Sequence, residues 1–172
     1  MIQSLESLHR AAQERGSRVL AVAAAQDAEV LLAVDAARKL GIATAILVGD
    51  EEQIRAIAQA HGIPLEPHRI LPEPDKVQAC RTAVKLVRDG QADAVMKGIV
   101  DTSIILKAVL DKEIGLRDAP VLSHVALFQV PGYDRLLYVT DAAMNIAPDL
   151  EAKKHIVSNA VKVAHALGNP NP

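Results

Sequence analysis

Hydrophobic and polar positions alternate along this chain with two periods, and the change of period predicts strands and helices in turn. Short continuous runs of Ala, Val, Leu and Ile are typical of buried strands, and each is followed by apolar residues at helical spacing. The pattern predicts strands at 18–25, 44–49 and 92–98, and helices at 1–16, 27–41, 50–62, 75–90, 101–113 and 149–168. Four prolines between residues 63 and 74 indicate a loop with one short edge strand.

The ends of several helices are marked by residues that cap them. Asp27 and Asp149 can accept hydrogen bonds from the free amides at helix starts, and Gly41, Gly62 and Gly90 follow the last helical residues. Acidic residues also open the helix at 50–62, where the helix dipole favours negative charge. These signals agree with the periodicity, so strand–helix units follow one another through the first two thirds of the chain.

Residues 120–148 break this alternation and predict a hairpin. Two β-rich runs flank the turn Pro-Gly-Tyr-Asp at 131–134. Successive strand–helix units imply parallel strands with right-handed crossovers. We therefore expect a single α/β unit over residues 1–172, a three-layer α/β/α architecture with a mostly parallel sheet, made mixed by the antiparallel hairpin.

The composition narrows the class of protein. Half of the 172 residues are hydrophobic but only 2% are aromatic, so small and branched aliphatic side chains must build the core. The net charge of -2 and the scattered basic residues give little support to nucleic-acid binding. Cys80 is the only cysteine, which excludes a disulfide within one chain and fits a reducing compartment. The sequence has no signal-peptide pattern and no apolar run long enough to span a membrane, so we expect a cytoplasmic protein without a membrane partner.

Candidate chemistry gathers in the turns that follow strands, because ligands of open α/β sheets bind beyond the carboxyl ends of the strands. Three such turns carry polar residues, at 23–27, 96–103 and 140–148. The turn at 96–103 combines Lys97, Gly98, Asp101, Thr102 and Ser103 at the start of a helix, which are the parts of an anion site. The alternative is a plain connector in which the glycine makes the turn, an Asp or Thr caps the helix and the lysine is solvated.

The turn at 140–148 offers a second candidate site. It places Thr140, Asp141 and Asn145 between an apolar strand and the long helix, and Pro148 keeps Ala147 out of helical geometry. These side chains can either contact a ligand or satisfy their own backbone as an Asx-rich turn.

Other reactive residue types point to structural roles. His124 lies among apolar residues within a predicted strand, on the opposite face from Ser123; the pattern favours a core histidine, and a catalytic role is the alternative. Cys80 lies in a helical pattern as a small buried hydrophobe. The remaining histidines have no partner at metal-ligand spacing, so we expect no metal site.

Three segments carry a resemblance to a known family: "ADAVMKGIVDTS", "LSHVALFQVPGYDRLLYVTDAAMNIAP" and "KKHIVSNAVKVAHALG". In their order and spacing they resemble the phosphate acetyl/butyryltransferases, most of all the phosphate butyryltransferases, along essentially the whole chain. The resemblance implies reversible transfer of an acetyl or butyryl group between coenzyme A and inorganic phosphate, with no metal ion or redox cofactor. It also implies two α/β/α domains, similar in fold to isocitrate and isopropylmalate dehydrogenases, and a homo-oligomer.

The resemblance also implies roles for particular residues. The acyl-CoA and phosphate substrates are expected to contact six of them: Lys97, Gly98, Thr102, Ser103, Ser123 and Asn145. Asp141 is expected to act in catalysis by orienting a proton or a basic side chain. Family members continue beyond the point that corresponds to Pro172, so we expect this chain to match the N-terminal portion of a two-domain transferase. Two alternatives stay open: a truncated module that binds a CoA-like or phosphorylated ligand without turnover, and a structural half that needs a partner chain.

Overall fold

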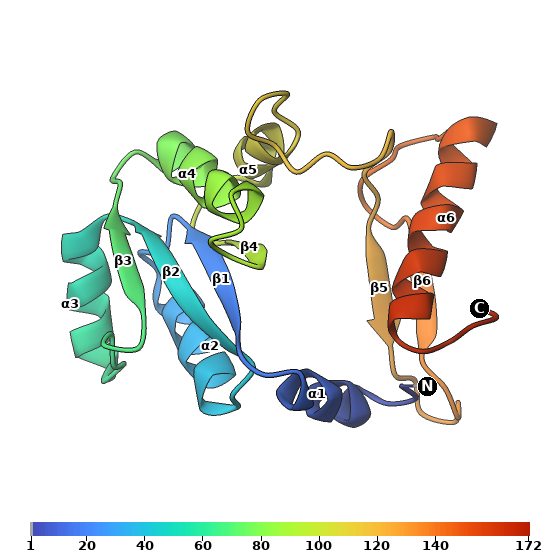
Figure 1. The fold of residues 1–172 in the computed structure, drawn as a ribbon, viewed down its shortest axis with the longest axis horizontal. Helices are drawn as coiled ribbons and strands as arrows, with labels where there is room; N and C mark the ends of the chain where they lie inside the picture. Colours follow the sequence, from blue (N-terminus) through green and yellow to red (C-terminus); the bar gives the residue numbers. More distant parts are fainter. Residues whose placement is uncertain (1) are drawn as a thin grey trace. The chain divides into compact units, whose positions relative to one another are not determined.

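The computed structural model describes residues 2–172, which form two compact units (Figure 1). The parallel-sheet unit is Arg15–Arg117, and the hairpin unit is the described part of Met1–Glu14 together with Asp118–Pro172. The sequence indicates one α/β unit, and the division arises because the two ends of the chain pack with each other. The amide of Leu5 donates to Gln129 Oε1 at 2.9 Å, and the amide of Ile2 donates to the carbonyl of Leu167 at 3.0 Å.

The parallel-sheet unit is built on a four-stranded sheet whose order is β3-β2-β1-β4. All neighbouring strands are parallel, as the repeated strand–helix pattern predicts. The strands are β1 (Arg18–Ala23), β2 (Ala43–Gly49), β3 (Arg69–Pro72) and β4 (Ala94–Lys97). The short strand expected in the proline-rich loop is confirmed as β3, and it lies at an edge, where prolines are tolerated.

Helices cover both faces of this sheet, which confirms the three-layer architecture (Figure 1). Along β1, Val22 packs with α2 (Ala28–Lys39) and α3 (Glu51–His61), whereas Ala21 and Ala23 pack with α4 (Lys76–Arg88) and α5 (Thr102–Val109). Because successive side chains of a strand point to opposite faces, the apolar run of β1 is buried on both sides.

The hairpin unit contains α1 (Leu5–Glu14), β5 (Val125–Phe128), β6 (Leu137–Thr140) and α6 (Leu150–Ala166). The two strands pair antiparallel, with Val125 opposite Thr140 and Phe128 opposite Leu137, which confirms the predicted hairpin. The expectation that they join the parallel sheet is wrong, because they form a two-stranded sheet of their own. The two strands of a hairpin pair with each other because a short turn joins them. The sequence of a hairpin therefore predicts which strands pair, but it does not show which sheet the pair joins.

Two differences in element bounds have local causes. β1 ends at Ala23 rather than near Ala25, because Ala24 adopts a left-handed backbone conformation with φ of 54°. α5 ends at Val109 because the carboxylate of Asp111 accepts hydrogen bonds from the amides of Glu113 and Ile114, at 2.8 and 3.1 Å, and so turns the chain. Within the described residues, no helix is both long and apolar enough to cross a membrane.

Candidate functional site

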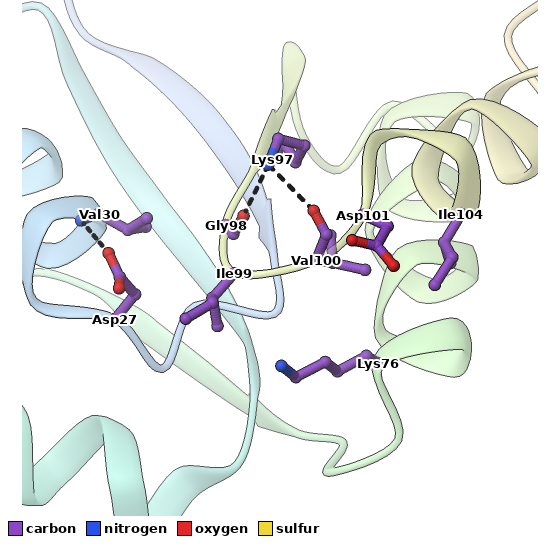
Figure 2. A pocket seen from close by; sticks show the side chains of 9 residues that line it. All are labelled: Asp27, Val30, Lys76, Lys97, Gly98, Ile99, Val100, Asp101 and Ile104. Carbon is purple, nitrogen blue, oxygen red and sulfur yellow. Dashed lines mark hydrogen bonds between the residues drawn. The ribbon is translucent and has the colours of Figure 1, made fainter.

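A cavity of about 430 Å³ lies at the carboxyl ends of the strands in the parallel-sheet unit (Figure 2). The turns after β1 and β4 contribute to it, as does the start of α4, which follows β3, because parallel neighbours end at the same edge of a sheet. Its walls come from the first residues of three helices and from the turn after β4: Asp27, Val30, Lys76, Lys97, Gly98, Ile99, Val100, Asp101 and Ile104. Two of the three turns singled out in the sequence therefore meet at one site.

The turn after β4 is held tightly against the end of β1. The amides of Gly98 and Ile99 donate to the carbonyls of Ala23 and Ala24, at 2.8 and 2.9 Å. A Cβ at position 98 would lie 2.2 Å from the carbonyl oxygen of Ala24, so only glycine allows this approach. Ala24 itself, fully buried, holds the left-handed conformation that other residues avoid. Backbone contacts to β1 therefore hold the part of the cavity lining at Gly98 and Ile99 in place without a ligand.

The two lysines of the cavity differ in their partners. Lys97 Nζ donates to the carbonyls of Gly98 and Val100, at 3.3 and 3.0 Å, and so closes the turn on itself. Lys76, the first residue of α4, is exposed, and its ammonium has no hydrogen bond or ion pair within residues 2–172. Lys76 was not among the residues predicted from the sequence; its signal was a lysine directly after a capping aspartate that follows a strand.

The start of α5 also differs from the other helix starts. Asp101 occupies the N-cap position, but its side chain makes no capping hydrogen bond. Four other helices have an N-cap aspartate that does bond an amide of the first turn: Asp27, Asp50, Asp75 and Asp149. The expected substrate residues Thr102 and Ser103 open this helix and are exposed, but they lie outside the cavity lining. Lys97 and Gly98 are the expected residues that do line it.

The turn at 140–148, in the hairpin unit, uses its polar groups internally. The carboxylate of Asp141 accepts hydrogen bonds from the amides of Ala143 and Met144, at 3.2 and 3.1 Å, from the amide of His124 at 3.4 Å and from the side chain of Asn145. Desolvation raises the pKa of Asp141, but these hydrogen bonds together outweigh it and lower that pKa to about 2. Asp141 is therefore a carboxylate at neutral pH, and its charge stabilises the turn.

Ser123 and Asn145, the expected substrate residues of the hairpin unit, are also engaged in hydrogen bonds, Asn145 with Asp141 and Ser123 with a residue of α6. Asn145 Nδ2 donates to the carbonyl of Leu122 at 2.9 Å as well as to Asp141. Asn159 of α6 donates to Ser123 Oγ at 2.8 Å and to the carbonyl of Val121 at 3.0 Å. Asn159 is a second residue that sequence analysis missed, and its signal was an amide within the apolar pattern of the long helix.

Cys80 and His124, the reactive residues outside the two turns, differ in their burial. Cys80 is buried in α4, as predicted; burial raises the pKa of its thiol, and the nearby Lys97 offsets only part of that rise. His124 is exposed and precedes β5, so its prediction as a core histidine within a strand is wrong. The described residues contain no group of three or more His, Cys, Asp or Glu side chains placed to hold a metal ion.

Comparison with known proteins gives a consistent result. The family model described as "Phosphate acetyl/butaryl transferase" matches residues 69–172. A phosphate butyryltransferase of Clostridium acetobutylicum is 47% identical over 172 residues, which is 100% of this chain and 57% of the relative. A phosphate butyryltransferase of Clostridium beijerinckii is 46% identical over 168 residues, 98% of this chain and 56% of the relative.

A solved structure agrees with these sequence matches. The crystal structure of a branched-chain phosphotransacylase from Enterococcus faecalis V583 aligns with a TM-score of 0.73 and 30% sequence identity, covering 88% of this chain and 52% of that one. The chain therefore spans about half the length of the curated relatives and of the solved structure that it matches.

Proposed function

Since this chain belongs to the phosphate acetyl/butyryltransferase family, we propose that it is the N-terminal portion of an enzyme that transfers an acyl group between coenzyme A and inorganic phosphate. The acyl group is butyryl or acetyl. The observation that carries the proposal is the cavity of the parallel-sheet unit, where Lys76, Lys97 and the first turn of α5 offer ammonium and amide donors at one place. Coenzyme A and inorganic phosphate are both anions that such donors bind.

The proposed reaction is a displacement at the thioester carbonyl. An oxygen of phosphate attacks the carbonyl carbon, a C–O bond forms and the C–S bond breaks. The products are the acyl phosphate and the CoA thiolate, which takes the proton that phosphate gives up. Holding both substrates side by side supplies much of the acceleration, and ammonium and amide donors stabilise the oxyanion that develops. No oxidation state changes, so the chemistry needs no redox cofactor, and we propose that it needs no metal ion.

The individual residue assignments are part of this proposal. Gly98 lets the turn approach β1, and Thr102 and Ser103 supply hydroxyl groups beside the cavity. In the hairpin unit, Ser123 and Asn145 remain predicted substrate residues. Asp141 is proposed to act by positioning: its hydrogen bonds fix the turn that carries Asn145.

We further propose a cytoplasmic homo-oligomer. The single cysteine, buried and free, supports a reducing compartment. Large apolar side chains are exposed on the hairpin unit, among them Ile146 at 97%, Leu150 at 68% and Val157 at 58% exposure. Exposed apolar patches and open sheet edges favour association with another chain.

The test is acyl transfer by the purified 172-residue chain. Butyryl-CoA and phosphate are mixed with the protein, and free CoA thiol is followed with time; a reaction without phosphate is the control. Phosphate-dependent release above that control supports a transferase site in this chain. A folded chain that binds butyryl-CoA without releasing thiol supports the alternative of a binding module. A folded chain that does neither supports a structural half and contradicts the proposal for this polypeptide.

A further inference from the structure

The two lysines of the cavity are expected to play different parts, and this goes beyond the reaction itself. We infer that Lys76 is the cation of the cavity that pairs with a phosphate group at the nucleotide end of coenzyme A, whereas Lys97 mainly holds its own turn. The inference rests on the proposed function, because it names the part of the substrate that this cavity receives.

The two lysines differ in how much of their positive charge is available to a ligand. The ammonium of Lys97 already donates to the carbonyls of Gly98 and Val100, so part of its capacity holds the turn together. The ammonium of Lys76 has no partner within residues 2–172, and Figure 2 shows its side chain extending from the start of α4 toward Ile99 and away from Asp101. A cation that is not used by the fold costs least to recruit for a ligand.

The size and the surface of the cavity suit a ligand larger than free phosphate. Its volume of about 430 Å³ lies within the range of small-molecule sites and exceeds what a single orthophosphate fills. Val30, Ile104 and Ile99, which is 44% exposed, give it apolar walls. A ligand that combines phosphate groups with a flat, largely apolar ring matches this mixture better than free phosphate does.

The cavity lining also contains two carboxylates, which differ in their hydrogen bonds. Asp27 is engaged as a helix cap, since its Oδ1 accepts from the amide of Val30 at 3.1 Å, but Asp101 has no capping bond. A bare phosphate gains nothing from a free carboxylate, which repels it. A nucleotide brings hydroxyl and amino donors beside its phosphates, and Asp101 can accept a hydrogen bond from one of them.

The experiment measures binding without turnover. Coenzyme A is titrated into the wild-type chain and into Lys76→Met by calorimetry. The same titration is made with Lys85→Met, which removes an equal charge from an exposed site of the same helix, nine residues or about 13.5 Å further along its axis. We expect Lys76→Met to weaken CoA binding about tenfold, the usual effect of losing a charge-assisted hydrogen bond. Lys85→Met should bind CoA like the wild type, and the melting temperature of Lys76→Met should be unchanged.

Further titrations distinguish a phosphate group of coenzyme A from free orthophosphate as the partner of Lys76. Butyryl-pantetheine, which lacks the nucleotide, should bind wild type and Lys76→Met equally. Equal CoA affinity of wild type and Lys76→Met overturns the inference, and so does a wild-type chain that binds no CoA. Loss of orthophosphate binding alone in Lys76→Met overturns the assignment to the nucleotide end. Intact, Lys76-dependent CoA binding in a chain without turnover supports the inference while it removes the proposed catalysis.

Discussion

Two turns of this molecule each carry an aspartate directly after a strand or a strand-end loop, and they use it in opposite ways. The turn at 140–148 directs its polar side chains inward, so that Asp141 is held by three backbone amides and by Asn145. The turn at 97–101 is fixed by backbone contacts to β1, so that the carboxylate of Asp101 and the ammonium of Lys76 across the cavity stay free.

The difference shows which groups a fold leaves available for a ligand. In the hairpin unit, the side chains replace backbone contacts that a short two-stranded sheet does not provide, and their hydrogen-bonding capacity is used up. In the parallel-sheet unit, Gly98 and the carbonyls at the end of β1 build most of the turn, Lys97 adds two side-chain hydrogen bonds to it, and the carboxylate of Asp101 is spared. A ligand site is therefore expected where the backbone, rather than the side chains, holds the turn.

The largest expected effect comes from Gly98→Ala. The added methyl group would meet the carbonyl oxygens of Ala24 and Ala23, at 2.2 and 2.6 Å, so the turn must move away from β1. We expect a loss of about 3 kcal/mol in the free energy of unfolding, measured by urea titration. The control is Gly90→Ala, where open space surrounds the site and only the backbone φ of +72° resists, at about 1 kcal/mol. Equal losses in the two variants would show that the turn is not fixed by this contact.

The next effect is that of Asp141→Asn on stability and on its pH dependence. An amide cannot accept from all four donors, so we expect a loss of about 2 kcal/mol near neutral pH, measured by urea unfolding. The pKa of Asp141 is lowered from 3.8 to about 2 on folding. Its carboxylate therefore stabilises the fold fully above pH 3.8, and this stabilisation is lost as the pH falls toward 2.

When the pH is lowered from 3.8 to about 2, Asp141→Asn should therefore lose less stability than the wild type. Asp134→Asn, in the exposed turn of the hairpin, is the control and should follow the wild type. Turnover that falls in Asp141→Asn while stability stays at the wild-type value would break the comparison, because Asp141 would then act on substrate rather than on its own turn.

The smallest effect distinguishes two aspartates at helix starts. Asp27→Ala removes a capping hydrogen bond to Val30 and should cost about 1 kcal/mol. Asp101→Ala removes no such bond and should change stability by less than about 0.5 kcal/mol. Thermal unfolding of both variants measures the contrast. A cost at Asp101 equal to that at Asp27 would mean that its carboxylate caps α5 in solution.

Much of the fold was predictable because its signals are local. Apolar runs identified β1 and β2, Asp27 and Asp149 were recognised as caps, and the hairpin turn was placed correctly. The meeting of the turns after β1 and β4 followed from the parallel order of the strands. These features depend on neighbours within a few residues or on a general rule of sheet topology.

The roles of individual polar residues were not predictable in the same way. Lys97 drew attention because it stands in the turn, but its ammonium is tied to that turn, whereas Lys76 comes from a helix far away in sequence. For Asp141 the sequence left open a ligand contact or an Asx-rich turn, and the four donors around its carboxylate favour the turn. Whether a polar side chain already has its hydrogen-bond partners depends on which distant segments pack beside it in the fold. A single sequence does not contain that information.

The small side chains between β1 and α4 have one more consequence. Ala21 and Ala23 of the strand meet Ala79, Cys80 and Ala83 of the helix, and all are fully buried. Because the side chains on both sides are small, the helix and the sheet pack closely and leave little empty space between them. Such close packing resists compression. The backbone of α4 at Lys76 is therefore held in place by this packing. The position of the Lys76 ammonium relative to a ligand then depends only on the torsion angles of its four-carbon side chain.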